Sequence, residues 1–251
     1  MLVERIPHGP IVELKLARAP VNALDPNLCN ELRTALGEAI AGGAQGIVLS
    51  GGPKVFSAGL DVPHLLSLGD DRAALMSAWS AFFDAARALA ESPVPVAAAL
   101  AGHAPAGGCV LALCCDYRVM AEGPYRLGLN ETQVGLVAPE GIQYLMRRVV
   151  GLHRAERLLV GGQMVDSATA YAIGLVDELA GVDEVALRAR MWLEALVALP
   201  REPMLRTRAI ARADVVAAMQ PERIRLDSFI DAWTAPDTQA GLRALIARLG
   251  K

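Results

Sequence analysis

The first hundred residues alternate between short apolar stretches and amphipathic stretches. Residues 11–16 alternate apolar and polar positions and predict a strand, whereas 46–50 and 94–100 are continuous apolar runs typical of buried strands. Between them, apolar residues recur every three or four positions over 26–41 and 71–91, which predicts two helices. This order of strand, helix, strand, helix and strand predicts a layered α/β core.

Polar and helix-breaking residues mark the ends of these two helices. Asp25 and Pro26 form a pair typical of an N-cap followed by proline at the first helical position. The second helix is expected to begin at Asp70 or Asp71. A Gly-Gly pair at 42–43 ends the first helix, and a Ser-Pro pair ends the second.

The same order continues to about residue 200, after which the pattern becomes purely helical. Further strands are predicted near 116–121, 125–127 and 175–179, and helices from the glycine turn at 106–108 to Cys115, over 139–150 and over 167–173. The later helices are expected near 183–199, 203–218, 221–233 and 237–249, separated by Pro203, Pro221 and Pro236. We therefore predict an α/β core over residues 1–200 and a helical region over residues 201–251.

The helical region must bury its apolar face, either on its own core or on a neighbouring subunit. It carries nine Arg and Lys residues against six Asp and Glu residues. Arg206, Arg208 and Arg212 could contact phosphates. A solvated helix face is the favoured interpretation, because charged side chains are mostly exposed.

Composition and charge exclude several classes of protein. Hydrophobic residues make up 53% of the chain and the net charge is −3 without a basic cluster, which argues against a nucleic-acid partner. No uncharged apolar run approaches the roughly 20 residues of a membrane span, so no membrane partner is expected. The spacing of the cysteines fits no zinc motif, and no secretory start is present. We expect a cytoplasmic protein with no metal site and with four cysteines as core residues: Cys29, Cys109, Cys114 and Cys115.

Two glycine-containing turns follow predicted strands of the core. One is Phe-Ser-Ala-Gly-Leu-Asp at 56–61, and the other is Pro-Ala-Gly-Gly-Cys at 105–109. Loops at the carboxyl ends of strands commonly bind ligands in α/β proteins, and glycine allows a close approach of the backbone. The second turn opens a helix, whose free N–H groups could hold an oxyanion. Simple tight turns are an equally good interpretation of either motif alone.

Glu131 stands alone among apolar residues. If it is buried, its pKa rises and it becomes a competent base near neutral pH, whereas composition alone favours an exposed glutamate at a helix start. His103 lies near the second glycine turn but is better explained as a structural histidine. Cys109 at the start of a helix is better explained by burial than by nucleophilic use.

Several separated motifs, in order along the chain, resemble the crotonase (enoyl-CoA hydratase/isomerase) superfamily. They are the two glycine turns and Leu-Ala-Leu-Cys-Cys-Asp-Tyr-Arg at 111–118, within a match that extends from residue 20 to residue 176. Cys-Asp-Tyr-Arg at 115–118 and Gly-Leu-Asn-Glu-Thr-Gln at 128–133 are most similar to the mitochondrial-type Δ3,Δ2-enoyl-CoA isomerases. The resemblance implies an α/β, ClpP/crotonase-like spiral of ββα units in two roughly perpendicular sheets, with a helical C-terminal trimerisation region.

The resemblance also implies a site. The backbone N–H groups of Ala58 and Gly107 would form an oxyanion hole for the thioester carbonyl, and Glu131 would be the catalytic base. The substrate would contact Ala58, Gly59, Leu60, Asp61, Gly107 and Asn130. Leu129, Val134, Leu136 and Val137 would form an apolar neighbourhood that excludes water.

The resemblance implies that a 3-enoyl-CoA is converted to trans-2-enoyl-CoA in fatty acid β-oxidation. Hydratases of the superfamily use two glutamates, and the second falls on Val110 here, so hydration is expected to be slow. Glu140 at the start of the following helix could interact with the helix dipole or point into the acyl pocket, where a second carboxylate would favour dienoyl isomerisation. A hydratase, a dienoyl-CoA isomerase, a thioester hydrolase and a non-catalytic CoA-binding protein are the alternatives. CoA enters as part of the substrate without a further cofactor, and homotrimers or hexamers are expected.

Overall fold

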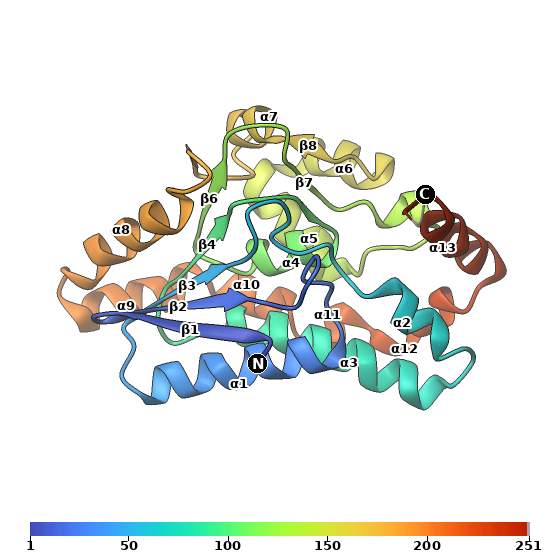
Figure 1. Cartoon of the computed structure of the whole chain (residues 1–251), viewed down its shortest axis with the longest axis horizontal. Helices are drawn as coiled ribbons and strands as arrows, with labels where there is room; N and C mark the ends of the chain where they lie inside the picture. Colours follow the sequence, from blue (N-terminus) through green and yellow to red (C-terminus); the bar gives the residue numbers. More distant parts are fainter. Residues whose placement is uncertain (250–251) are drawn as a thin grey trace.

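A six-stranded sheet forms the centre of the computed structural model, which describes residues 1–249 (Figure 1). The strands lie in the order β1-β2-β3-β4-β6-β9, with β1 antiparallel to β2 and each later neighbour parallel. Their bounds are β1 Val3–His8, β2 Ile11–Leu16, β3 Gly46–Ser50, β4 Val96–Leu100, β6 Tyr117–Ala121 and β9 Glu178–Ala180. Two of the predicted strands are therefore shifted, because β4 begins two residues late and β9 three residues late.

A smaller sheet of three short strands lies beside the first. Its order is β5-β7-β8, with β5 Ala104–Pro105, β7 Arg126–Gly128 and β8 Val165–Asp166. β5 is parallel to β7, and β7 is antiparallel to β8. The small sheet connects the second glycine turn to the segment that precedes Glu131.

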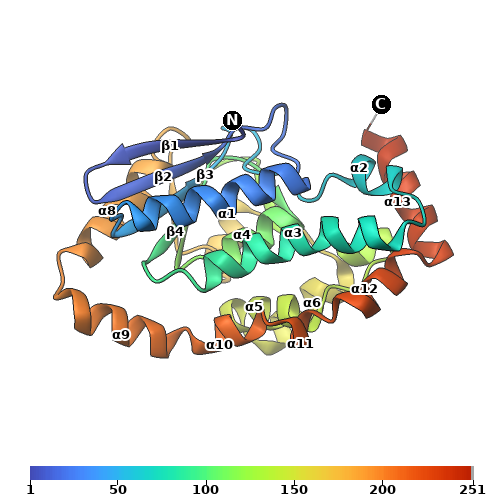
Figure 2. The ribbon, with the colours of Figure 1, turned by 90° about the horizontal axis from the view of Figure 1, so that it is seen from below.

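Helices cover both faces of the large sheet, so its central strands are buried on each side. Helices α1 (Pro26–Ala41) and α3 (Arg72–Ala90) run side by side beneath one face (Figure 2). Helix α8 (Val185–Val197) packs on β3, β4 and β6 from the other face. In β4, Ala97 and Ala99 belong to the core beneath α8, whereas Ala98 and Leu100 belong to the larger core, as the two-residue period of a strand requires.

The predicted caps of the first helices are confirmed. Asp25 accepts a hydrogen bond from the Leu28 N–H at 2.8 Å at the start of α1. Asp71 caps α3 by accepting from the Ala74 N–H at 2.9 Å. Each carboxylate satisfies one N–H group that has no partner within its helix.

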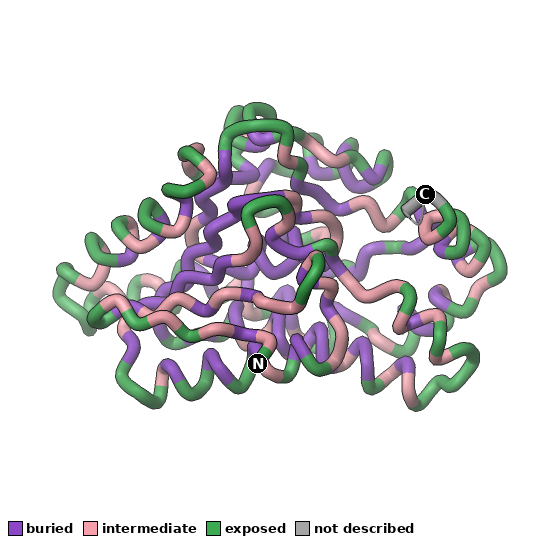
Figure 3. The backbone as a smooth tube through the Cα atoms, in the orientation of Figure 1, coloured by how far each residue is buried: buried purple, intermediate pink, exposed green. Residues whose placement is uncertain are grey.

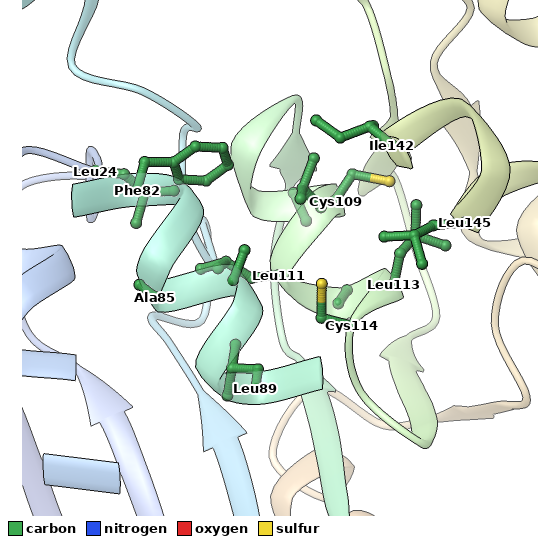
Figure 4. Packing of buried hydrophobic residues seen from close by; sticks show 14 of the residues in the cluster. Leu24, Phe82, Ala85, Leu89, Cys109, Leu111, Leu113, Cys114, Ile142 and Leu145 are labelled. Atoms are coloured by element: carbon green, nitrogen blue, oxygen red, sulfur yellow. The ribbon is translucent and has the colours of Figure 1, made fainter. Parts of the chain in front are cut away.

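Helix α4 (Gly107–Leu113) is buried along its whole length. It lies between α3 and α5 (Glu140–Val150), and the side chains of Phe82 from α3 and of Ile142 and Leu145 from α5 pack beside it (Figure 4). All four cysteines are buried, as predicted, and burial raises the pKa of each thiol. Such thiols are structural rather than reactive.

Three short helices between the predicted elements were not predicted. They are α2 (Val62–Ser67), the 3₁₀ helix η1 (Glu131–Val134) and α6 (Leu152–Gly161). The predicted helix near 167–173 is α7 (Ser167–Ala172). Helices α2 and η1 are too short for the pattern of apolar residues to distinguish them from loops.

The C-terminal helices are more broken than predicted. The helix expected near 203–218 is α9 (Arg201–Ala211) followed by α10 (Ala213–Ala218), and that near 221–233 is α11 (Pro221–Ile224) followed by α12 (Leu226–Trp233). Pro203 does not separate helices, because it lies in the first turn of α9, where its missing N–H needs no partner. The last helix is α13 (Pro236–Leu249).

The C-terminal region packs on its own chain, with α10 against α5 and α12 against α3. Figure 2 shows α9 to α12 along one side of the molecule, after which α13 turns toward α2. Outer helix faces are exposed, whereas the central strands β3 and β4 and helix α4 are buried (Figure 3).

The two arginines Arg208 and Arg212 are neither on a solvated face nor free to bind phosphate. Both pair with Asp116, at 2.8 Å and 3.2 Å, and all three side chains are about nine-tenths buried. Only Arg206 is exposed, where it pairs with Glu202 at 3.7 Å. The favoured interpretation was therefore wrong for the two arginines that attach the C-terminal region to the core.

Candidate active site

A cavity of about 270 Å³ lies where both glycine turns meet the C-terminal helices. Its walls come from the first glycine turn, α3, the start of α4, η1, the start of α5, α12 and α13. Most of its walls are apolar, and within the described part of the chain Glu131 is the one charged residue that lines it. The lining residues are Ala58, Leu60, Val62, Trp79, Phe82, Phe83, Pro105, Ala106, Gly107, Val110, Asn130, Glu131, Val134, Leu136, Pro139, Ile142, Phe229, Trp233, Leu242 and Leu245.

Glu131 is the first residue of η1 and lines this cavity. Its Oε2 atom is buried and has no hydrogen-bond partner within the described chain. Burial disfavours the charged form and raises the pKa of the Glu131 carboxyl to about 7, against a smaller lowering effect of its own backbone N–H. A carboxyl with this pKa can accept and return a proton near neutral pH.

Hydrogen bonds to the end of α6 fix the turn that carries Glu131. Thr132 donates a hydrogen bond to the Leu159 carbonyl at 3.2 Å, and Gln133 donates to the Gly162 carbonyl at 2.8 Å. These bonds attach η1 to the end of α6. The Glu131 side chain therefore projects from a fixed turn rather than from a free loop.

Two backbone N–H groups lie close together at the same cavity. Within residues 1–249, neither the Leu60 N–H nor the Gly107 N–H donates a hydrogen bond to the protein. The two turns touch, because a Cβ atom on Gly59 would lie 3.3 Å from the Gly107 nitrogen and one on Gly107 would lie 2.6 Å from Leu60 Cδ2. Gly59 has φ +81°, which glycine adopts freely.

The backbone before Gly107 is strained. Ala106 has φ +45°, a conformation that residues with a side chain rarely adopt. Its N–H donates to the Gly128 carbonyl at 2.9 Å, which anchors the turn to β7. Such strain costs on the order of 1–3 kcal/mol and is concentrated at functional sites.

The prediction that the Ala58 N–H binds the thioester oxygen was wrong. This N–H donates to the Val21 carbonyl at 2.9 Å, so it is not available to a ligand. Ala58 lines the cavity through other atoms. The Gly59 N–H donates to Ser57 Oγ at 3.3 Å and the Asp61 N–H to the Leu24 carbonyl at 3.1 Å, so within the turn the Leu60 N–H is the one that remains free beside Gly107.

The other predicted contact residues divide into two groups. Asn130 lines the cavity together with Ala58, Leu60 and Gly107, whereas Asp61 does not. The Asp61 carboxylate accepts from Arg18 at 2.7 Å and from the His64 N–H at 3.0 Å, where it caps α2. Gly59 also does not line the cavity, and its positive φ instead sets the conformation of the turn.

The predicted apolar neighbourhood of Glu131 is partly confirmed. Val134 and Leu136 are buried and line the cavity, and Leu129 is buried behind it. Val137 is 63% exposed, so its predicted role in excluding water was wrong. Val110 is fully buried in α4 and lines the cavity, where it places an isopropyl group.

Glu140 does not point into the cavity. It is exposed at the start of α5 and pairs with Arg223 of α11. The expected structural role of His103 is confirmed, because its Nδ1 accepts a hydrogen bond from the Arg126 N–H at 3.0 Å. Neither side chain therefore adds a second acid or base to the site.

Aromatic side chains form a wall that sequence analysis did not predict. Five of them line the cavity: Trp79, Phe82 and Phe83 from α3, and Phe229 and Trp233 from α12. Aromatic residues are only 4% of the chain, yet these five fall within residues 79–83 and 229–233. This clustering in two short segments is the one sequence signal that could have suggested that they lie together. The sequence contains no indication that α12 returns to α3.

Within residues 1–249, no cluster of three or more His, Cys, Asp or Glu side chains could hold a metal ion. The described helices also include none with the length and hydropathy that a membrane span requires. The site thus offers one carboxyl, two free backbone amides and an apolar cavity.

The comparison with known families agrees with this arrangement. The model described as enoyl-CoA hydratase/isomerase matches residues 8–244, and the chain belongs to this family. The crotonase fold expected from the sequence is confirmed, including its helical C-terminal region.

Individual relatives are similar over nearly the whole chain. Enoyl-CoA delta isomerase 1, mitochondrial, of Homo sapiens is 30% identical over 253 residues, which cover 99% of this chain and 83% of the relative. Probable enoyl-CoA hydratase echA17 of Mycolicibacterium paratuberculosis is 31% identical over 223 residues, 86% of each chain. The crystal structure of human mitochondrial delta3-delta2-enoyl-CoA isomerase superposes with a TM-score of 0.93 at 30% identity, covering 100% of this chain and 98% of the other.

Proposed function

We propose that this enzyme is an enoyl-CoA isomerase that converts a 3-enoyl-CoA to the trans-2-enoyl-CoA, with Glu131 as the only proton-transferring side chain. The observation that carries this proposal is the buried, unpaired Glu131 carboxyl oxygen at an apolar cavity that also holds the free N–H groups of Leu60 and Gly107. The isomerases among the relatives support the same reaction.

In this mechanism the thioester carbonyl oxygen accepts hydrogen bonds from the Leu60 and Gly107 amides. The Glu131 carboxylate removes the C2 proton, and the electrons of that C–H bond form an enolate whose oxygen the amides stabilise. The protonated Glu131 then returns the proton to C4 as the double bond forms between C2 and C3. One such amide donor typically contributes about 3 kcal/mol to lowering the barrier.

The cavity walls favour isomerisation over competing reactions. Val110 and Leu136 are apolar and buried, so they hold no water for attack at C3. The hydratase named among the relatives keeps hydration as a second candidate activity. Since Val110 cannot accept or donate a proton, hydration would depend on Glu131 alone. The exposed Glu140 gives no support to a dienoyl-CoA isomerase.

The wider role is proposed on the same basis. The isomerase acts in fatty acid β-oxidation, in the cytoplasm, with CoA as part of its substrate and without a metal or further cofactor. It assembles as a homotrimer or as a hexamer of paired trimers. Apolar side chains exposed on α8, α9 and the turn between them support an assembly: Leu187, Met191, Leu199 and Ile210.

Substitution Glu131→Gln tests the assignment directly. It keeps the size of the side chain but removes the base, so kcat/KM for 3-enoyl-CoA is expected to fall about 1,000-fold. The rate of 2-enoyl-CoA formation measures this loss, and Glu140→Gln serves as the control with an unchanged rate.

An unchanged rate in Glu131→Gln would refute the role of this carboxyl. Rapid hydration of a 2-enoyl-CoA by the wild-type enzyme would contradict the role given to Val110. Tight CoA binding without turnover of any thioester would identify a binding protein instead.

A further inference from the structure

One indole group lies at the centre of the aromatic wall. The ring centroid of Trp79 is 4.6 Å from that of Phe229, 5.4 Å from that of Trp233 and 6.0 Å from that of Phe83. All four residues line the cavity, and Trp79 is only 4% exposed. The wall is therefore closely packed around this side chain.

The N–H group of this indole is buried without a partner. Trp79 Nε1 makes no hydrogen bond within the part of the chain that the structure describes. A buried donor without an acceptor is unfavourable, and a phenylalanine would supply a similar aromatic surface without it. The indole N–H is thus a polar group in an otherwise apolar wall.

Trp79 would lie beyond the reacting carbons of a bound acyl chain. It precedes Phe82 by three residues on α3, so both side chains lie on the same side of the helix, one turn apart. The Phe82 ring lies beside the amide turn, because a Cβ atom on Gly107 would be 3.3 Å from Phe82 Cε2. An acyl chain that extends from Gly107 along α3 toward α12 reaches Phe82 first and Trp79 later.

The charge of the cavity restricts what the indole could bind. Among the lining side chains that the structure describes there is no Lys or Arg, and the one charged group is the acidic Glu131. An acyl chain with a terminal carboxylate would therefore be buried without a cation, which is strongly unfavourable. A neutral oxygen needs only one donor.

We propose that the Trp79 N–H donates a hydrogen bond to a neutral oxygen on the acyl chain, beyond the double bond. The preferred substrates are then 3-enoyl-CoA thioesters whose chains carry an ether, ketone or hydroxyl oxygen, rather than purely hydrocarbon chains. This proposal rests on the isomerase function proposed above and specifies its substrate class.

The test compares 3-enoyl-CoA thioesters of equal chain length, one all-carbon and the others with one ether oxygen in place of a methylene at successive positions. At one position the wild-type kcat/KM is expected to exceed that of the all-carbon substrate about two- to tenfold, the range of one hydrogen bond. Trp79→Phe is expected to abolish this preference. Trp192→Phe, whose ring stacks on Tyr117 outside the cavity at 4.6 Å, is expected to retain it.

The proposal is overturned if the all-carbon chain is best at every position, or if Trp79→Phe keeps the same preference. Either result would indicate that the N–H instead faces the Phe229 ring, which is inclined at 73° to the indole. Turnover of the all-carbon substrate reports on the isomerase function separately.

A binding measurement tests the Trp79 hydrogen bond with wild-type protein alone, so it requires neither a folded variant nor turnover. The three tryptophans of ¹⁵N-labelled wild-type protein give three indole N–H resonances. The ether-containing acyl-CoA is expected to shift one of them downfield relative to the all-carbon ligand. Identical spectra with both ligands would also overturn the proposal.

Discussion

At the scale of single residues, the central feature is a carboxyl that has been buried without a compensating cation. The Glu131 oxygen Oε2 has no partner, and its pKa is raised to about 7 because burial disfavours the charged form. The sequence allowed either a buried or an exposed glutamate at this position. The packing of α6 and α13 against η1 decides between them.

The activity is expected to depend on the ionisation of this residue. The base must be deprotonated to remove the C2 proton, so kcat/KM should rise with pH and reach a plateau above about pH 7. Measuring isomerase rates between pH 5 and 9 would show this rise. A rate that is independent of pH through this range would contradict Glu131 as the base.

The same ionisation is expected to reduce stability. Because the folded-state pKa lies above the unfolded value, the contribution is most favourable below about pH 4.5 and is lost as pH rises through about 7. Glu131→Gln removes this loss. Its unfolding free energy relative to wild type should therefore be about 2–3 kcal/mol higher at pH 8 than at pH 5, measured by urea denaturation. An equal difference at both pH values would show that the carboxyl is not perturbed.

The proposed oxyanion donor illustrates the limit of motif-based prediction. The motif correctly directed attention to residues 56–61, and the cavity lies against this turn. It did not reveal which N–H remains free, because that depends on the hydrogen bond from Ala58 to Val21. A pairing between segments distant in sequence leaves no local signal.

At the scale of elements, the longer strands and the first helices followed the sequence closely, whereas the two-residue strands β5 and β8 were not predicted and the C-terminal helices are more broken than expected. Apolar periodicity and capping residues located α1 and α3 because those signals are local. The breaks at Arg212 and Arg225 depend on tertiary structure. Arg212 donates to the carbonyls of Cys114 and Cys115 at the end of α4, and Arg225 has φ +51°.

The charged contact between α9 and the core is expected to contribute substantially to stability. Asp116 accepts two hydrogen bonds from Arg208, each 2.8 Å long, and lies 3.2 Å from Arg212. Asp116→Asn would leave two buried guanidinium groups without their anion. We expect the unfolding free energy to fall by about 3 kcal/mol, measured by chemical denaturation.

The control for this variant is Glu202→Gln, which removes the partner of Arg206 on the same helix. That pair is almost fully solvated, with side chains 78% and 81% exposed. Its loss should change stability by less than about 1 kcal/mol. Equal effects of the two variants would contradict the attachment role of Asp116.

At the scale of the whole molecule, the cavity combines segments from residue 58 to residue 245. The carboxyl and the glycine turns come from the α/β part, and two of the five aromatic side chains of the wall come from α12. The sequence indicated a helical C-terminal region but not that it closes the cavity. That closure arises from packing of α12 on α3, which no periodic pattern specifies.

The proposed assembly makes a prediction at the same scale. A trimer of a 26.5 kDa chain has a mass of roughly 80 kDa, and a hexamer twice that. Sedimentation equilibrium should give one of these masses. Ile210→Lys, at a 79% exposed position on α9, should lower the mass if this face lies between subunits. A mass near 26.5 kDa for the wild-type protein would exclude the assembly.

The contribution of α12 to the cavity has a consequence for biosynthesis. A ribosome completes the glycine turns and Glu131 well before it adds Phe229 and Trp233. A nascent chain that ends at α8 thus contains Glu131 but lacks the part of the aromatic wall that α12 supplies. Until translation has passed α12, Trp79 of α3 lacks the Phe229 and Trp233 rings against which it packs, so the acyl cavity is still incomplete.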